Sequence, residues 1–279
     1  MKVIRDNASL SKTLGQKSVG FIPTMGALHS GHLSLVEESL NRGLYTVVCI
    51  FVNPTQFNNQ GDFDNYPVNT DRDIELLNSV GCDVAFIPTR GEIYPDGDNG
   101  QKYIHDFGEL ENKYEGEFRP GHFKGVGQVV HRLFDIVSPT QAFFGEKDFQ
   151  QLAIVRELVR KAGLNVEIVG MPTVRRESGL AMSSRNQRLN PEQIDKAVLL
   201  YKSLAFANDN HGKMSIEAIK FEVASWFKAD QEWNLEYFEI IEPATFQKAS
   251  EESEPPLRAI IAASLGVVRL IDNMAIKAS

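Results

Sequence analysis

The segment Phe21-Ile-Pro-Thr-Met-Gly-Ala-Leu-His-Ser-Gly-His32 joins the end of an apolar run to a turn and then to an amphipathic pattern. Residues 19–22 have the composition of a buried strand, and the helical spacing of one apolar face follows at Leu33, Val36 and Leu40. The first N–H groups of a helix have no partner within it, and the helix dipole is positive at that end. A strand, a turn of small residues and a helix N-terminus therefore predict a polyphosphate site.

Two glycines and two histidines give this turn its chemistry. Gly26 and Gly31 let the backbone approach a phosphate closely, and His29 and His32 can donate hydrogen bonds into the same space. The His-x-x-His spacing also suits two metal ligands, but zinc needs three or four, and no cysteine or further histidine cluster accompanies the pair. Two surface histidines with ordinary hydrogen bonds are the remaining alternative.

Short apolar runs alternate with amphipathic helical patterns over the first two thirds of the chain. The runs are 19–22, 45–52, 84–87, 142–144 and 166–169, and the helical stretches are 33–41, 71–80, 126–136 and 152–162. Strands that are apolar throughout and separated by helices indicate a parallel sheet covered on both faces. We predict an α/β, Rossmann-like doubly wound sheet, with ligands at the carboxyl ends of the strands near a topological switch point.

The pattern changes after about residue 188. Two helical stretches are followed by three strand-like runs, at 191–208, 215–229, 235–241, 258–265 and 267–271. This order predicts a smaller α+β domain with an antiparallel sheet. We expect the first domain to span residues 1–185 and the C-terminal domain to span residues 186–279.

Composition narrows the class of protein. The formal net charge of −8 argues against a broad nucleic-acid surface, which needs clustered Lys and Arg. Cys49 and Cys82 are isolated thiols, which fit a reducing compartment. No apolar stretch approaches the roughly 20 residues that span a bilayer, and the N-terminus lacks the apolar centre of a signal peptide. We expect a cytoplasmic protein with no membrane or nucleic-acid partner.

Two further polar segments follow predicted strands. Asn53 and Gln56 supply neutral amides, which suit a hydroxy acid whose carboxylate must stay free to attack. In the segment 145–148, Asp148 can accept from ribose hydroxyls and Lys147 offers a mobile charge for phosphates. Taken alone, the first segment reads as a polar turn and the second as an ordinary helix start.

The wording and order of these motifs resemble the pantothenate synthetases, adenylate-forming ligases related in fold to class I aminoacyl-tRNA synthetases. The matching segments are 23–32, 51–57, 118–126, 145–148 and 182–185, the last resembling the flexible Lys-Met-Ser-Lys-Ser loop of those synthetases. In the third segment Arg119, His122 and Lys124 are expected as cations. The chain departs from the family at Phe149, where Tyr is usual, and at Ser178, where Asp is usual.

The resemblance implies ATP-dependent ligation of pantoate with β-alanine through a pantoyl adenylate, with Mg2+ accompanying ATP. Its expected ATP-binding residues are Met25, Gly26, Ala27, Leu28, His29, Ser30, Gly31, His32, Gly145, Glu146, Lys147, Asp148, Val174, Met182, Ser183, Ser184 and Arg185. Catalytic roles are expected for His29, His32, Lys147, Ser183, Ser184 and Arg185, and substrate binding for Asn53, Gln56 and Gln151. The protein ligands of Mg2+ stay open, with Asp71 and Asp73 as candidates, and a homodimer is implied.

Three other functions share part of this pattern. A nucleotidyltransferase that stops after nucleotide transfer would use the same histidine turn but would not need Gln56 and Gln151. A tRNA-charging enzyme is disfavoured by the acidic balance and by the lack of room for an anticodon domain. A nucleotide sensor would bind ATP but release no AMP when both acids are present.

Overall fold

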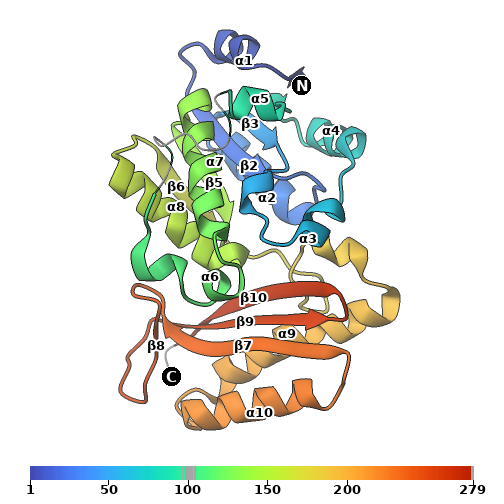
Figure 1. The fold of residues 1–279 in the computed structure, drawn as a ribbon, viewed down its shortest axis with the longest axis vertical. Helices are drawn as coiled ribbons and strands as arrows, with labels where there is room; N and C mark the ends of the chain where they lie inside the picture. Colours follow the sequence, from blue (N-terminus) through green and yellow to red (C-terminus); the bar gives the residue numbers. More distant parts are fainter. Residues whose placement is uncertain (96, 98–102, 104, 278–279) are drawn as a thin grey trace. The chain divides into compact units, whose positions relative to one another are not determined.

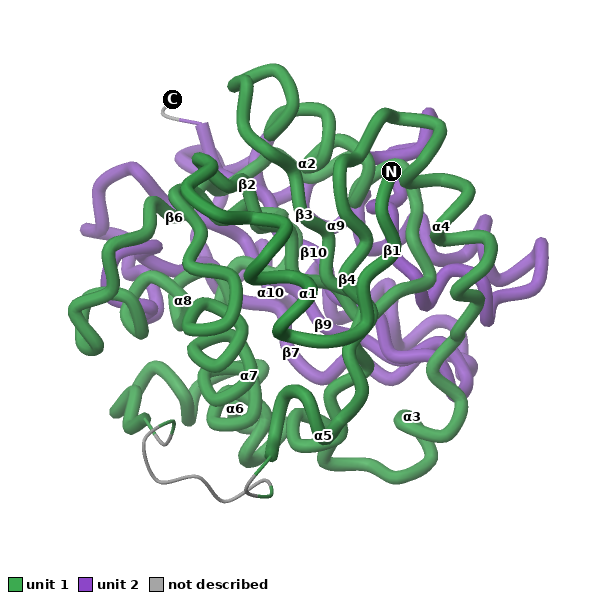
Figure 2. The backbone as a smooth tube through the Cα atoms, turned by 90° about the horizontal axis from the view of Figure 1, so that it is seen from above, with its two compact units in different colours: residues 1–174 green, residues 175–279 purple. Residues whose placement is uncertain are grey.

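The computed structural model describes residues 1–95, 97, 103 and 105–277. The chain divides into two compact units, Met1–Val174 and Arg175–Ser279, coloured separately in Figure 2. The division falls before residues 175–185, which the sequence analysis grouped with the first domain. Among the described residues, no helix combines the length and apolar character that a membrane crossing requires.

Six parallel strands form the sheet of the first unit, in the order β1-β4-β3-β2-β5-β6 (Figure 1). They are β1 (Lys2–Ile4), β2 (Val19–Thr24), β3 (Tyr45–Ile50), β4 (Val84–Phe86), β5 (Gln141–Gly145) and β6 (Glu167–Met171). Strand β2 pairs with β3 on one side and with β5 on the other. The chain builds the β3 side first and then passes to β5, so the switch point lies between β2 and β5. The predicted doubly wound parallel sheet is confirmed.

Helices cover both faces of this sheet (Figure 1). The helices of the first unit are α1 (Asn7–Leu14), α2 (Ser30–Asn41), α3 (Gln60–Asp64), α4 (Thr70–Ser79), α5 (Arg90–Ile93), α6 (Glu115–Phe118), α7 (His122–Val137) and α8 (Phe149–Ala162). Phe21 and Phe144 pack into a core with α1, α7 and α8, whereas Ile22 and Phe143 pack into a second core with α2 and α4. Because alternate residues face different cores, the strands are apolar throughout.

The second unit is a four-stranded antiparallel sheet packed against two helices. Its elements are η5 (Ser184–Arg188), α9 (Pro191–Asn210), α10 (Ile216–Lys228), β7 (Trp233–Glu242), β8 (Gln247–Lys248), β9 (Leu257–Leu265) and β10 (Val268–Ile276). The predicted last strand ended at residue 271, but β10 continues five residues further. Its added part holds Asp272, which is buried and makes a two-pronged ion pair with Arg175 at 2.6 and 2.9 Å.

A glycine lets α7 approach the loop that follows β3. A Cβ atom on Gly125 would lie 2.4 Å from the carbonyl oxygen of Thr55 and 2.7 Å from the Cα of Gln56. Both atoms belong to the backbone of the short 3₁₀ helix η1 (Pro54–Gln56), so they can move only if that helix moves.

Gly125→Ala should therefore lower the free energy of unfolding by about 1–3 kcal/mol, the usual cost of overpacking. Chemical denaturation measures the change. Gly91→Ala is the matched control, because the nearest atom to its added Cβ would be 3.9 Å away, and we expect it to stay within about 0.5 kcal/mol of the wild type. Equal stability of the two variants would show that α7 and η1 have room to separate.

Candidate active site

Three of the predicted site segments lie at one edge of the first sheet. The turn 25–29 follows β2, the pair Asn53 and Gln56 follows β3, and Gly145 ends β5. Strands β2 and β3 pair in register up to Thr24 opposite Ile50, so their carboxyl ends are level. The segments therefore meet at the switch point of the sheet, where ligands bind in folds of this type.

The turn after β2 has an unusual backbone that is tied to α4. Gly26 and Ala27 have left-handed φ angles of 86° and 50°. The amides of Ala27 and Leu28 donate to the two carboxylate oxygens of Asp73, at 2.9 and 2.7 Å. Asp73 is 1% exposed. A left-handed non-glycine residue costs roughly 1–2 kcal/mol, so these two hydrogen bonds help to hold a conformation that the chain alone disfavours.

The two histidines of the turn cap α2 with their side chains. His29 is the N-cap, and its Nδ1 accepts from the amide of Gly31 at 3.1 Å. The amide of His29 in turn donates to Nδ1 of His32 at 3.3 Å, and the two rings stack with their centroids 4.0 Å apart. We expected the first amides of this helix to be available for phosphate. For His29 and Gly31 that was wrong, because imidazole nitrogens of the same motif already accept from them.

Burial keeps both imidazoles neutral. It lowers the pKa of His29 to about 4, with the Lys147 ammonium acting in the same direction and Asp148 opposing it. Burial, His29 and Lys147 together place the pKa of His32 well below its ordinary value. Because each Nδ1 accepts a hydrogen bond, the single proton of each neutral ring lies on Nε2. The motif therefore offers two Nε2–H donors next to one cation, Lys147.

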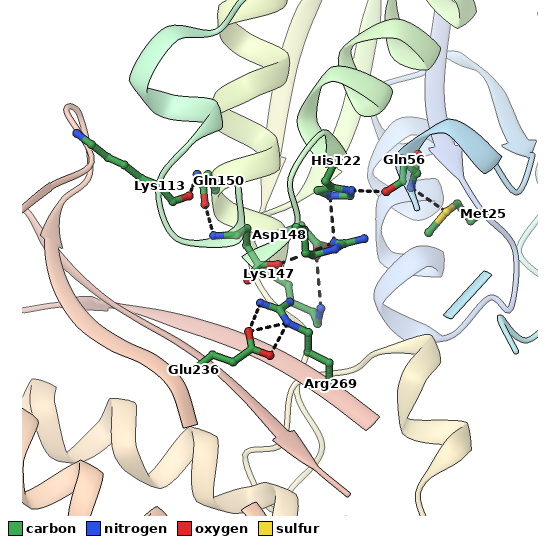
Figure 3. A network of polar contacts seen from close by, with 11 residues as sticks. Met25, Gln56, Lys113, His122, Lys147, Asp148, Gln150, Glu236 and Arg269 are labelled. Carbon is green, nitrogen blue, oxygen red and sulfur yellow. Dashed lines mark hydrogen bonds and ion pairs between the residues drawn. The ribbon is translucent and has the colours of Figure 1, made fainter. Parts of the chain in front are cut away.

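Lys147 and Asp148 belong to the short 3₁₀ helix η4 (Glu146–Asp148) between β5 and α8. The Lys147 ammonium lies 3.5 Å from the Asp148 carboxylate (Figure 3). The Lys147 side chain is mostly buried, and about half of the Asp148 side chain is exposed. A positive charge held directly after β5 is suited to a negatively charged ligand, and the neighbouring strand β2 leads into the turn and the helix that hold the histidines.

Asn53 and Gln56 differ in how much of their amides the protein uses. Asn53 is 1% exposed, its Nδ2 donates to Thr55 Oγ1 at 3.0 Å, and its Oδ1 accepts from the Tyr94 hydroxyl at 2.9 Å. Gln56 donates from Nε2 to the sulfur of Met25 at 2.9 Å (Figure 3). A thioether is a weak acceptor. The NH2 group of Gln56 can thus exchange the thioether for a better acceptor, while its Oε1 accepts from Nδ2 of Asn53 at 3.3 Å. The Asn53 amide supports the loop.

His122 braces Gln56 from α7. Its Nδ1 donates to the backbone carbonyl of Gln56 at 2.8 Å (Figure 3), and its Nε2 lies 3.1 Å from a guanidinium nitrogen of Arg119. The carbonyl can only accept and the guanidinium can only donate, so Nε2 carries no proton. His122 is therefore neutral here, and its expected role as a cation was wrong.

The neighbouring glutamines of α8 serve different purposes. Gln150 accepts from the amide of Glu115 at 3.1 Å and donates to the carbonyls of Leu110 and Lys113 at 2.7 and 2.8 Å. Within the described part of the chain, Gln151 is half-buried and its side chain makes no hydrogen bond. Gln150 thus fastens the preceding loop, and Gln151 keeps its amide for a ligand.

The remaining predicted residues fall at the end of the first unit or in the second. Val174 closes the first unit after β6. In the second unit Ser183 caps η5, its hydroxyl accepting from the amide of Arg185 at 3.3 Å, and Ser184 is buried. Met182 and Arg185 are half-buried.

No metal centre is built from side chains alone in the ranges that the structure describes, where no three His, Cys, Asp or Glu residues form a group that could hold an ion. Asp73, a candidate magnesium ligand, uses both oxygens for backbone amides. The sequence could not reveal this role, because Asp73 lies 45 and 46 residues from its partners and meets them only in the folded unit.

His29 gives a pH prediction with a definite sign. Its folded pKa of about 4 lies below the ordinary 6.5, so the folded state resists protonation. Below pH 6.5 the unfolded chain binds a proton at His29 that the folded state does not bind. The free energy of unfolding should therefore be highest above pH 6.5 and should decline as the pH falls toward 4. NMR titration of the imidazole Cε1–H measures the pKa, and denaturation at pH 7 and pH 5 measures the loss.

His29→Asn is the control for that titration, because asparagine is a good N-cap that does not titrate. It should remove the part of the pH dependence that belongs to His29 while keeping α2 folded. A His29 resonance that titrates near 6.5 in the wild type would contradict the buried, neutral state.

Known proteins resemble this chain over nearly its whole length. The family model for pantoate-beta-alanine ligase matches residues 2–275. A pantothenate synthetase from Christiangramia forsetii is 47% identical, over 99% of this chain and 99% of the relative. The crystal structure of pantothenate synthetase from Thermus thermophilus has a TM-score of 0.94 at 41% identity, over 100% of both chains.

A further structure, pantoate-beta-alanine ligase from Francisella tularensis complexed with beta-gamma ATP and beta-alanine, has a TM-score of 0.83 at 34% identity. That match covers 100% of this chain and 99% of the other. With the family model spanning nearly the whole sequence and relatives aligned from end to end, the chain belongs to the pantoate–β-alanine ligase family.

Proposed function

We propose that this protein condenses pantoate with β-alanine at the expense of ATP, through a pantoyl adenylate. The observation that carries the proposal is the arrangement at the switch point. The Nε2–H donors of two imidazoles lie at the start of α2, which follows β2, and the Lys147 ammonium lies directly after β5. In the described part of the chain the Gln151 side chain makes no hydrogen bond, and the Gln56 amide donates to a weak thioether acceptor that a ligand can replace. The Francisella relative was solved with ATP and β-alanine compounds, two of the three reactants.

In the first half-reaction a carboxylate oxygen of pantoate attacks the α-phosphorus of ATP. A P–O bond to the acid forms, the bond to the bridging oxygen breaks, and pyrophosphate leaves. Negative charge grows on the phosphate oxygens, and preoriented donors stabilise it best where water is scarce. We assign this role to Nε2–H of His29 and His32 and to the ammonium of Lys147.

In the second half-reaction the uncharged amine of β-alanine attacks the acyl carbon of the adenylate. A C–N bond forms, the C–O bond to phosphate breaks, AMP leaves and the amine loses a proton. This step depends mainly on holding the amine close to the acyl carbon.

We assign pantoate to Gln56 and Gln151. Neutral amides can orient a hydroxy acid without pairing with its carboxylate, so the carboxylate stays nucleophilic. Asn53, first expected at the substrate, supports Gln56 instead in our proposal, because its own amide is engaged within the protein.

The proposal also covers the ATP-binding residues, the metal ion and the oligomeric state. ATP is assigned to residues 25–32, 145–148, 174 and 182–185. Mg2+ prefers several waters and phosphate oxygens to an all-protein cage, so we expect it to enter with ATP. A cytoplasmic homodimer completes the proposal, and resemblance to the family supports it.

A product assay with ATP, pantoate and β-alanine, each omitted in turn, tests the function. Pantothenate and AMP should form only when all three are present. Exchange of labelled pyrophosphate into ATP should require pantoate but not β-alanine. Exchange without pantoate, or nucleotide transfer to another acceptor, would point to a nucleotidyltransferase.

Gln56→Ala and Gln151→Ala should each raise the KM for pantoate about ten- to a hundred-fold while leaving the KM for ATP near the wild-type value. Loss of a hydrogen bond to a buried substrate group typically costs about 1–3 kcal/mol. Steady-state kinetics with each substrate varied separately provides the measurement.

Gln150→Ala is the matched control for the two pantoate variants. Because Gln150 holds only backbone groups, its loss should lower thermal stability and leave the KM for pantoate unchanged. If Gln150→Ala and Gln151→Ala behave alike, the two glutamines do not have the separate roles assigned here.

Arg185→Ala should slow adenylate formation much more than amide formation, because a guanidinium acts on phosphate charge that develops in the first half-reaction. Supplying pantoyl adenylate should then restore most of the product. Arg188→Ala, in the same 3₁₀ helix, is the control and should affect both steps little. An Arg185 variant that stays equally slow with adenylate supplied would exclude the phosphate role.

A further inference from the structure

Asp73 is a buried carboxylate on which the mechanism above does not draw. It lies in the first turn of α4 and is 1% exposed. Its Oδ2 accepts from the amide of Ala27 at 2.9 Å, and its Oδ1 accepts from the amide of Leu28 at 2.7 Å. Each oxygen thus holds one amide of the turn that immediately precedes His29.

Burying the charged Asp73 carboxylate costs free energy, and its hydrogen bonds to the turn offset that cost. Burial raises the pKa of Asp73, while the amides of Leu28 and Ala27 and the charge of Arg72 act in the opposite direction. Taking a carboxylate out of water is costly unless it is hydrogen-bonded. It is tolerated when it satisfies groups that would otherwise be left without partners.

The shape of the turn leaves little freedom for another arrangement. Gly26 and Ala27 are both left-handed, and a Cβ on Gly26 would lie 3.0 Å from Asp73 Oδ2 and 3.1 Å from a methyl carbon of Ile50. The carboxylate therefore packs directly against the turn as well as binding its amides. Beyond Leu28 the chain enters the His29 cap, so the position of both imidazoles depends on where this turn ends.

The geometry points to Asp73 as a positioning residue for adenylation: by clamping the amides of Ala27 and Leu28, it sets the Nε2–H donors of His29 and His32. This inference rests on the proposed function for what those donors bind. Asp73 then fixes the conformation of the turn and does not bind the metal ion, since both of its carboxylate oxygens accept from backbone amides.

Asp73→Asn tests the clamp, because it keeps the size of the side chain but turns one of the two acceptors into a donor that faces a backbone N–H. The matched control is Asp83→Asn. Asp83 accepts from the amide of Thr46 at 2.8 Å, a similar carboxylate–amide bond near the amino end of β3, away from the turn. Both variants lose one charge and one such bond.

Asp73→Asn should lower kcat for pantoate-dependent pyrophosphate exchange about ten- to a hundred-fold, the effect of a small misplacement of catalytic groups. The KM for pantoate should stay near the wild-type value. The pKa of His29, measured by NMR, should rise from about 4 toward 6.5 as the cap loosens. Asp83→Asn should change neither kcat nor the His29 titration.

A second variant changes the turn instead of the carboxylate that binds it. Gly26→Ala keeps the carboxylate but places a methyl group against it, so it should also raise the His29 pKa and lower kcat. If Asp73→Asn proves unstable, this variant and the protection of the Ala27 and Leu28 amides from hydrogen exchange in the wild type decide the question. Unprotected amides would overturn the inference.

The two proposals fail in different ways. If the wild type shows no pantoate-dependent exchange, the proposed function fails, while the His29 titration still reports on the clamp. If exchange is present but Asp73→Asn leaves the His29 pKa at about 4 and only raises the Mg2+ requirement, Asp73 is a metal ligand and the clamp is wrong. A loss of thermal stability equal to that of Asp83→Asn, with kcat and titration unchanged, would also overturn it.

Discussion

The pairing of β2 with β3 on one side and β5 on the other is the constraint on which the rest of the first unit depends. It buries Phe21 in one core and Ile22 in the other, so the strand cannot shift by one residue without exchanging its two faces. The same pairing aligns the ends of three neighbouring strands. Residues that are far apart in the sequence then share one edge, and that edge is where polar side chains gather.

The site at this edge is suited to a negatively charged ligand, although most of its polar groups are neutral. The two imidazoles lose their charge through burial and keep a defined tautomer because each Nδ1 accepts a backbone amide. Lys147 contributes a full positive charge at the neighbouring strand. Such a site can stabilise developing negative charge without changing its own protonation near neutral pH, and its donors are already oriented before the ligand arrives.

Much of the architecture could be predicted from the sequence, because its buried strands and amphipathic helices have strong patterns. The elements β1, α3, α5 and α6 were not predicted, since three to five residues carry too little periodicity. Helix α1 was also missed, because only Leu10 and Leu14 of its eight residues are buried. The sequence motifs identified His29, His32, Lys147 and Gln151 as candidate site residues, but they did not reveal which other residues position the site. The support from Asp73, Tyr94 and His122 depends on contacts across 41 to 66 residues, which only the folded chain creates.

The contrast between Gln150 and Gln151 bears on how the segment after β5 can change in length. Successive residues of an α-helix point about 100° apart, so one glutamine faces the loop at Leu110 and the next faces elsewhere. The 3₁₀ helix η4 runs directly into α8 with no residue between them, so an inserted or deleted residue between Gly145 and Phe149 has to be absorbed within η4 if both glutamines are to keep their places. The connection between β5 and α8 therefore offers little room for a change in length.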